Sequence, residues 1–184
     1  MKKYYLIVYC LVLVFAAGML TCPNPAVADT RKEIDREVKN ALEDLYEQYP
    51  SAKAMGAKAK GILVFPSIVK GGFLVGGQYD EGVLLKGGKA AGYYNTVQVS
   101  YGLQAGVQVF GYALFFMTES AMDYLDNSDG WEIGVGPSIV VVDEGMAMSK
   151  TTTTLKAEIY AFFFDQKGLM GGLGIQGTKI SKTD

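Results

Sequence analysis

Apolar and polar positions alternate with a helical period near the start of the chain, over residues 31–49. The apolar positions recur every three or four residues and are Ile34, Val38, Ala41, Leu42, Leu45 and Tyr49. This spacing predicts an amphipathic helix that packs on a core and is stopped by Pro50. Residues 51–60 are expected to add a second short helix that ends at Gly61.

From residue 62 onward the period changes to that of β-structure, and residues 97–109 alternate most regularly. The apolar positions of this segment are Val97, Val99, Tyr101, Leu103, Ala105, Val107 and Val109. The opposite face carries Gln98, Ser100, Gly102, Gln104, Gly106 and Gln108. Because this second face is polar but has no charge, we expect its positions to be partly buried or covered.

Turn and capping signals divide the rest of the chain into short elements. A buried strand 62–65 should stop at Pro66, and a hairpin of 72–79 and 82–86 is expected about Asp80 and Glu81. Thr118 is a suitable N-cap for a short helix that runs to Leu125, followed by a turn at 126–130. The remaining predicted strands are 111–117, 131–135, 138–142, 152–164 and 169–176.

The last two predicted strands flank a turn at 165–168 and are followed or interrupted by several glycines. These are Gly171, Gly172, Gly174 and Gly177. Glycines within β-structure mark bends, bulges or close backbone approach. The element order therefore predicts an α+β fold: a strongly curved, partly closed antiparallel sheet with N-terminal helices and one short inserted helix.

The first 28 residues read as an export signal. Lys2 and Lys3 precede an apolar run too short to span a membrane, and 26–28 (Ala-Val-Ala) is a suitable cleavage site. We therefore expect a signal peptide over 1–28, one domain over 29–184, and a periplasmic location or one on the periplasmic face of a bacterial membrane. Acylation of Cys22 is the less favoured alternative.

Residue content narrows the possible chemistry. The chain has no histidine, and both of its cysteines lie within the predicted signal peptide. Histidine or cysteine nucleophiles, disulfides and zinc held by these residues are thereby excluded for the mature chain. We expect no cofactor, no metal and no enzymatic activity, although a carboxylate pair or a Ser/Lys pair is not ruled out by sequence.

Two short motifs resemble known sites in spelling but not in context. A Gly-x-Gly-x-x-Gly spacing at 172–177 is not followed by a helix, so a dinucleotide site is not expected. Ser67 and Lys70 form a Ser-x-x-Lys spacing, but it follows a proline in a glycine-rich β-region and lacks the companion motifs of penicillin-recognising enzymes.

Charge is distributed unevenly. Residues 51–90 contain six lysines and two acids, whereas 91–149 contain seven acids and no lysine or arginine. A solvated surface explains this pattern as well as a basic face that meets anionic lipid headgroups does. A nucleic-acid partner is not expected, since the chain is acidic overall and has no arginine cluster.

Four sequence blocks together resemble the SYLF domain family, and more narrowly its exported bacterial members, the YSC84-related proteins. The blocks are 59–77 (AKGILVFPSIVKGGFLVGG), 100–108 (SYGLQAGVQ), 130–145 (GWEIGVGPSIVVVDEG) and 159–180 (IYAFFFDQKGLMGGLGIQGTKI). They appear in family order, and the match covers 37–180. The chain departs from the family at 92–96, where many members have a Trp-Ser-Pro-like segment.

The resemblance implies a lipid-binding domain. Eukaryotic relatives bind phosphoinositides and, in fungi, actin, and neither ligand is expected in a bacterial envelope. We therefore expect a non-enzymatic module that binds phospholipid at a membrane surface. The leading headgroup contacts are Lys58, Lys60 and Lys70, followed by Lys86 and Lys89, with Phe73 and Leu74 as apolar contacts. The alternative is a structural protein that binds another envelope protein through its sheet face or edge.

Overall fold

The computed structural model describes residues 31–127, 131–132, 136–142, 157–168 and 178–183. Side chains at 72–76, 98–106, 131–132, 168 and 178 are not part of this description. The chain divides into units Met1–Thr30 and Arg31–Asp184, and every described residue belongs to the second. The predicted signal peptide therefore lies outside the described residues.

Two helices open the described part, as the sequence predicts. Helix α2 spans Arg31–Gln48 and buries the predicted apolar stripe, namely Ile34, Val38, Ala41 and Leu45. Helix α3 spans Pro50–Gly56 and is shorter than predicted. Pro50 stands at its start, where a residue without a backbone N–H is tolerated because that donor would have no partner in the helix.

Strands β1 (Gly61–Lys86) and β2 (Lys89–Phe116) form one long antiparallel hairpin, whose register runs from Gly61 opposite Phe116 to Lys86 opposite Lys89. Gly87 and Gly88 make its turn with φ angles of 59° and 75°. Such angles favour glycine, and paired positive φ values suit the right-handed twist of a hairpin.

Two predicted strand ends are therefore wrong. Pro66 does not stop β1, because the residues after Phe65 form a bulge that accommodates it before pairing resumes at Ile68. Asp80 and Glu81 do not form a turn, because they pair with Thr96 and Asn95 in the middle of the hairpin. Composition alone favoured a turn there, and the long-range pairing with β2 overrides it.

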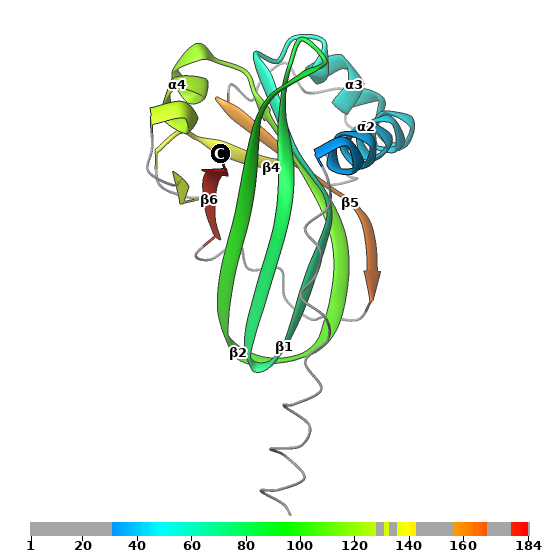
Figure 1. Ribbon diagram of the computed structural model, residues 1–184, viewed down its shortest axis with the longest axis vertical. Coiled ribbons are helices and arrows are strands. Elements are labelled where there is room, and N and C mark those ends of the chain that lie inside the picture. Colours follow the sequence, from blue (N-terminus) through cyan, green and yellow to red (C-terminus); the bar gives the residue numbers. More distant parts are fainter. Residues whose placement is uncertain (1–30, 128–130, 133–135, 143–156, 169–177, 184) are drawn as a thin grey trace, which may run out of the picture. The chain divides into compact units, whose positions relative to one another are not determined.

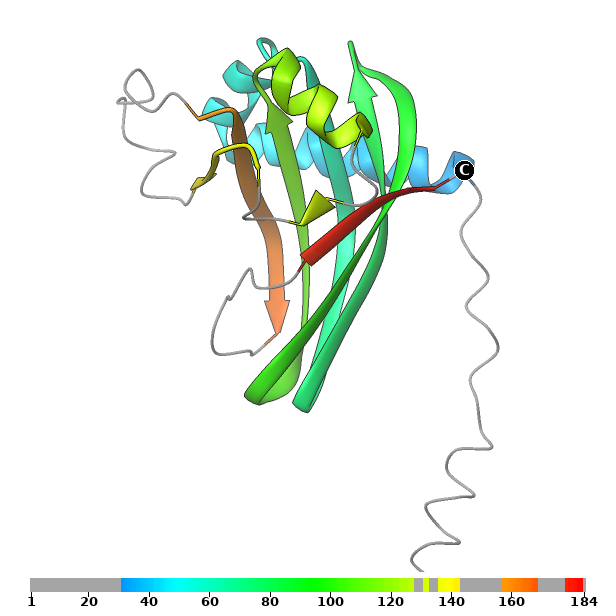
Figure 2. The ribbon, with the colours of Figure 1, turned by 90° about the vertical axis from the view of Figure 1, so that its left-hand side faces the viewer.

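The hairpin doubles back on itself, so that each strand has two halves that lie side by side (Figures 1 and 2). The register changes where both strands turn, between Phe73 opposite Ala105 and Val75 opposite Tyr101. Higher up, the two halves of β1 touch: a methyl group on Gly82 would lie 2.6 Å from the carbonyl oxygen of Val64. Only glycine permits this close approach.

The remaining strands extend the sheet from both halves of β2. Strand β5 (Ile159–Gly168) pairs with its second half and β6 (Thr178–Thr183) with its first. Strand β3 (Trp131–Glu132) adds to β6, and β4 (Ile139–Val142) adds to β5 in parallel. The order β3-β6-β2-β5-β4, with β1 on β2, gives a six-stranded mixed sheet.

The fold class α+β is thus confirmed, with two corrections to the expected sheet. It is not wholly antiparallel, since β4 and β5 run parallel. It is not partly closed, since the path of described strands ends at β3 on one side and β4 on the other. The glycine-rich segment that predicted strong curvature, 169–177, lies outside the described residues, so that reason for curvature stays untested.

Other boundaries differ in detail. The expected turn at 165–168 belongs to β5, and Asp165 has a φ of 51° beside a register shift. Strand β6 was not predicted. The predicted strand 169–176, residues 152–156, residues 133–135 and the turn residues 128–130 lie outside the described part. Helix α4, Glu119–Asn127, confirms the inserted helix, and Thr118 Oγ1 accepts a hydrogen bond from the N–H of Ala121 at 3.2 Å.

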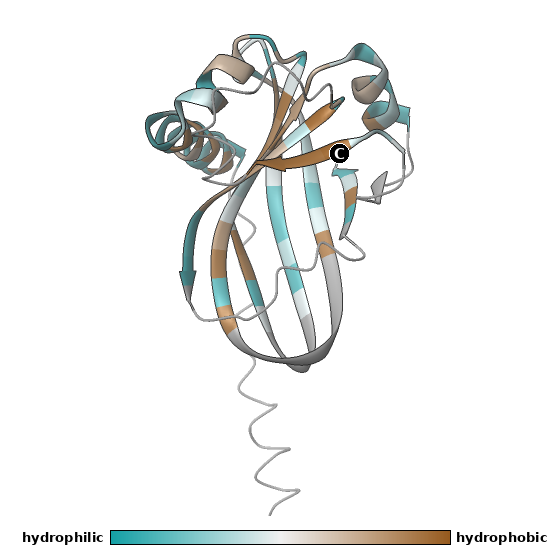
Figure 3. Ribbon diagram, turned by 180° about the vertical axis from the view of Figure 1, so that it is seen from behind, coloured by the Kyte–Doolittle hydropathy of each residue, from teal (hydrophilic) through white to brown (hydrophobic). Residues whose placement is uncertain are grey.

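Each face of the sheet has its own core. Helices α2 and α3 cover one face, where Val64, Phe115 and Phe162 are buried beneath the stripe of α2. Helix α4 covers part of the other, where Met122 and Leu125 pack with Leu63 and Tyr94. Figure 2 shows α2 running across the strands at one end of the sheet. Below the helices, hydrophobic and hydrophilic positions alternate along β1 and β2 (Figure 3).

Candidate functional site

Four of the five predicted lysines lie at the end of the hairpin that carries α3 and α4; we call Lys58, Lys60, Lys86 and Lys89 the lysine end. Lys86 and Lys89 flank the glycine turn opposite each other in the register. Lys60 immediately precedes β1, and Lys58 lies two residues before Lys60. The side chains of all four lysines are exposed. The fold therefore brings together four of the five lysines that the sequence analysis named, although they are distant along the chain.

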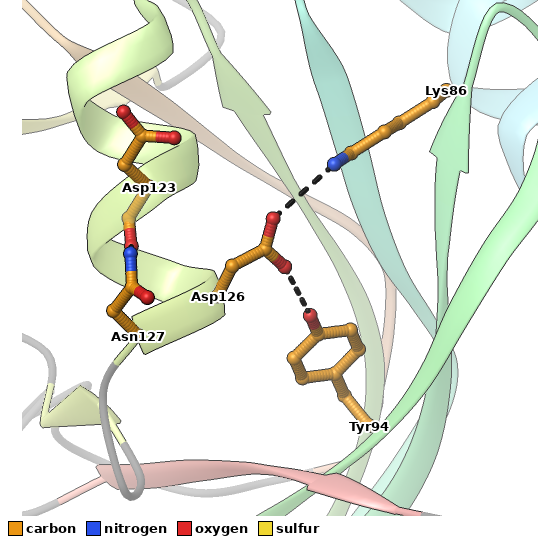
Figure 4. A network of polar contacts seen from close by, with 5 residues as sticks. All are labelled: Lys86, Tyr94, Asp123, Asp126 and Asn127. Carbon is orange, nitrogen blue, oxygen red and sulfur yellow. Dashed lines mark hydrogen bonds and ion pairs between the residues drawn. The ribbon is translucent and has the colours of Figure 1, made fainter.

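Acidic residues of α4 neutralise part of this charge. Lys60 forms an ion pair with Glu119 at 3.1 Å, and Lys86 forms one with Asp126 at 3.3 Å (Figure 4). Such exposed pairs are worth little in stability. The two pairs offset the positive charge of Lys60 and Lys86. Lys58 and Lys89 form no ion pair with a described residue, so they are the more available cations.

Asp126 links the lysine end to the core. Its second carboxylate oxygen accepts a hydrogen bond from the hydroxyl of Tyr94 at 3.2 Å, as Figure 4 shows. Burial raises the pKa of Tyr94, and the negative charge and hydrogen bond of Asp126 raise it further. The tyrosine therefore stays a neutral donor, and it holds Asp126 in place beside Lys86.

Lys70 does not belong to the lysine end. Its residue is only 3% exposed, and it lies opposite Gln108, itself 7% exposed, on the face of the hairpin that continues the core beneath α4. The uncharged polar face predicted for β2 is thus buried at Gln108, as expected. Phe73 and Leu74 lie where β1 turns back, and their side chains are outside the described residues.

Further polar residues on the same face were not singled out from the sequence. Gln78 is 7% exposed and Thr96 is fully buried. The carboxylate of Asp80 accepts hydrogen bonds from the backbone N–H groups of Glu81 and Ser67, and so it joins the two halves of β1. One oxygen of Asp80 and the amide oxygen of Gln78 have no hydrogen-bond partner among the described residues.

Burial raises the pKa of Asp80 to about 7, and the charges of Glu37 and Glu81 add to the effect. The two backbone hydrogen bonds oppose it but are the weaker influence. A carboxyl group that loses its hydration without gaining a cation favours its neutral form. The alternation of β1 contained a signal for this burial, because Gln78 and Asp80 fall on one face, but Asp80 was assigned to a turn.

The opposite face of the hairpin exposes apolar side chains beyond the reach of α2. Val69, Tyr79, Val97 and Val107 are 52, 56, 42 and 60% exposed. Val97 and Val107 lie on the apolar face that the alternation of 97–109 predicts. In this part of the sheet, polar groups are buried on one side and apolar groups meet solvent on the other.

Two kinds of feature are absent from the described residues. They contain no group of three or more histidine, cysteine, aspartate or glutamate side chains placed to hold a metal ion. None of their helices is long and apolar enough to cross a membrane.

Comparison with known proteins bears on residues 97–184, which contain the second half of β2, α4 and strands β3 to β6. These residues match the model of the family described as "Ysc84: Las17-binding protein actin regulator". No curated protein matched the chain. The resemblance to the Ysc84 (SYLF) domain family is thereby confirmed over this segment.

Proposed function

We propose that the protein is a non-enzymatic phospholipid-binding module of the bacterial cell envelope. The observation that carries this proposal is the gathering of Lys58, Lys60, Lys86 and Lys89 at one end of the hairpin. Each cation near a charged membrane surface contributes about 1 kcal/mol of attraction. The predicted export signal supports a location where the module meets a membrane.

The family match over residues 97–184 supports a binding role. The family's description names a Las17-binding actin regulator, which is a protein that acts by binding. The described polar cluster of Asp80, Gln78 and Thr96 lacks the paired nucleophile and base of covalent catalysis. We therefore favour recognition of a headgroup over its chemical conversion.

Vesicle binding with charge-reversal variants tests the proposal. The variant with Lys58→Glu and Lys89→Glu changes the two cations that the ion pairs with α4 do not include. Two lost contacts of about 1 kcal/mol each predict an affinity at least about 30-fold lower for vesicles that contain phosphatidylglycerol. Vesicles of phosphatidylcholine alone should bind weakly in both cases.

A matched control reverses two exposed cations of α2, with Lys32→Glu and Arg36→Glu. It makes the same change in net charge away from the lysine end, so its effect should be small. Equal losses in both double variants would mean that only net charge matters. Absence of vesicle binding by the unchanged protein would contradict the proposal as a whole.

The alternative, a protein that binds an envelope partner through a sheet edge, is favoured by β4. This strand ends the path of described strands, and it consists of Ile139-Val140-Val141-Val142. Val141 is 40% exposed. A photocrosslinking residue in place of Val141 would capture one stoichiometric protein if this edge is the binding site, and the unchanged protein would then bind no vesicles.

A further inference from the structure

On the face of the sheet that carries α2, a row of side chains crosses the part that α2 does not cover; we call Lys179, Val97, Tyr79, Val69, Val109 and Lys167 the apolar row. The register places Lys179 opposite Val97, and Val97 opposite Tyr79. On the other side of the row, Val69 lies opposite Val109, and Val109 opposite Lys167. Residues directly opposite each other point to the same face of a sheet.

The two halves of this row meet at the junction within β1. Asp80, next to Tyr79, accepts a hydrogen bond from the backbone of Ser67, two residues before Val69. Both halves share the face of the α2 core, since Val83 and Ala113 are buried there and lie an even number of residues from Tyr79 and Val109. Within each half of the row, three paired strands about 4.8 Å apart span roughly 10 Å.

The composition of the row is unusual for a solvated surface. Its centre is apolar, with Val69, Tyr79 and Val97 each 42 to 56% exposed, and Val107 extends it by one position at 60%. Of the six large apolar side chains that are exposed in the described part of the chain, four lie here. A contiguous exposed apolar patch of this kind marks a site of interaction.

The charges of the row identify its partner. An exposed lysine stands at each end, and no acid lies within the row. Beyond the row, Glu132 of β3 lies opposite Lys179 in the register, which leaves Lys167 as the end without an acid directly opposite it among the described residues. On the side of α2, Glu81 accepts a hydrogen bond from Tyr79 at 3.1 Å. Lysine stems can lie along apolar surface while their ammonium groups reach phosphate. This arrangement suits an anionic bilayer.

A second copy of the chain fits less well. A symmetric contact of row on row brings the lysines at the ends of one copy against those of the other, in either orientation. Like charges placed together in this way oppose association.

We infer that the apolar row docks on an anionic lipid bilayer, with its valines in the interfacial apolar region and Lys167 and Lys179 at the phosphates. This inference rests on the proposed phospholipid binding and assigns it a surface that the lysine end does not include. The apolar row and the lysine end share no residue, so substitutions can distinguish their contributions to vesicle binding.

The test measures binding of the purified protein to vesicles of phosphatidylcholine with and without phosphatidylglycerol. The triple variant Val69→Thr, Val97→Thr and Val107→Thr keeps the β-branched shape and removes apolar surface. It should lower the affinity by about tenfold or more. Val141→Thr is the matched control at an exposed valine of β4, and it should bind as the unchanged protein does. Lys167→Gln and Lys179→Gln should each cost about fivefold on phosphatidylglycerol vesicles.

A second measurement reports insertion directly. In Val69→Trp, acyl chains carrying bromine should quench more fluorescence than they quench in the unchanged protein, which has only Trp131. Unchanged binding by the triple variant together with an unquenched Val69→Trp would overturn the inference, while vesicle binding itself would still uphold the proposed function. Loss of self-association, and not of vesicle binding, in the triple variant would assign the row to a contact between copies.

Discussion

At the scale of single residues, Asp80 shows how far composition can mislead. An Asp-Glu pair between apolar segments is typical of a turn. In the fold, Asp80 instead accepts hydrogen bonds from backbone N–H groups of both halves of β1, and its other oxygen is buried without a partner in the described part of the chain. Its raised pKa of about 7 follows from this loss of hydration.

Stability should therefore depend on the protonation of Asp80. The pKa of an unfolded aspartate is about 3.9, so between about pH 4 and about pH 7 the folded state binds more protons than the unfolded state. The contribution of this group to stability is fully present below about pH 4 and is lost as pH rises to about 7. Asp80→Asn should remove that part of the pH dependence.

Urea unfolding at about pH 5 and about pH 8 measures the effect. The free energy of unfolding should fall less between these two values in Asp80→Asn than in the unchanged protein. Glu47→Gln, at an exposed acid of α2 that is not among the charges raising the pKa of Asp80, should keep the full decrease. An identical decrease in all three proteins would show that Asp80 does not titrate in this range.

At the scale of elements, α4 is fastened to the hairpin by packing on one face and by Asp126 at its end. Met122 and Leu125 pack in the core. Asp126 accepts a hydrogen bond from the hydroxyl of Tyr94 and forms an ion pair with Lys86. The part-buried hydrogen bond should matter more for stability than the exposed ion pair, because its donor is fixed in the core and its acceptor is charged.

Tyr94→Phe tests this ranking. Removing the hydroxyl leaves the packing of the ring in place and removes a part-buried hydrogen bond to a carboxylate, so the free energy of unfolding should fall by about 1–2 kcal/mol. Lys86→Gln should cost about 1 kcal/mol or less. Tyr124→Phe is a control on the exposed face of α4 and should have little effect. A larger loss in Lys86→Gln than in Tyr94→Phe, measured by urea unfolding, would reverse the ranking.

At the scale of the folded unit 31–184, the doubled hairpin brings distant residues together. The two halves of β1 approach at Gly82, where an added methyl group would meet the Val64 carbonyl and the Phe65 ring. The same doubling places the two ends of the hairpin together and thereby assembles both the lysine end and the apolar row (Figure 1).

Gly82→Ala should therefore destabilise the protein by about 1–3 kcal/mol, because backbone cannot move aside as a flexible side chain can. Gly77→Ala is the matched control in the same strand. No atom lies within 4 Å of its added methyl group, so it should be neutral or stabilising by up to about 1 kcal/mol. Equal midpoints of urea unfolding for the two variants would mean that the contact between the halves of β1 is not tight.

Local pattern was sufficient for elements whose stability depends on neighbours in sequence. The period of three to four residues located α2, the Thr118 cap located α4, and the alternation of 97–109 separated the buried face of Gln108 from the exposed face of Val107. The resemblance to the Ysc84 family, which the family model confirms over residues 97–184, was also readable from sequence, because it depends on the order of blocks and not on their contacts.

Long-range pairing determined the rest. That β1 passes through Pro66 and through Asp80 depends on partners in β2 about 15 to 45 residues away, which no local propensity encodes. The same pairing buried Lys70 and placed Lys167 and Lys179 at the two ends of one row, although the sequence pointed to Lys70 and to neither of the others. Sequence determined which residue types face one side of each strand. Only the tertiary structure decided which strands lie beside one another and in which register, because both depend on contacts between distant segments.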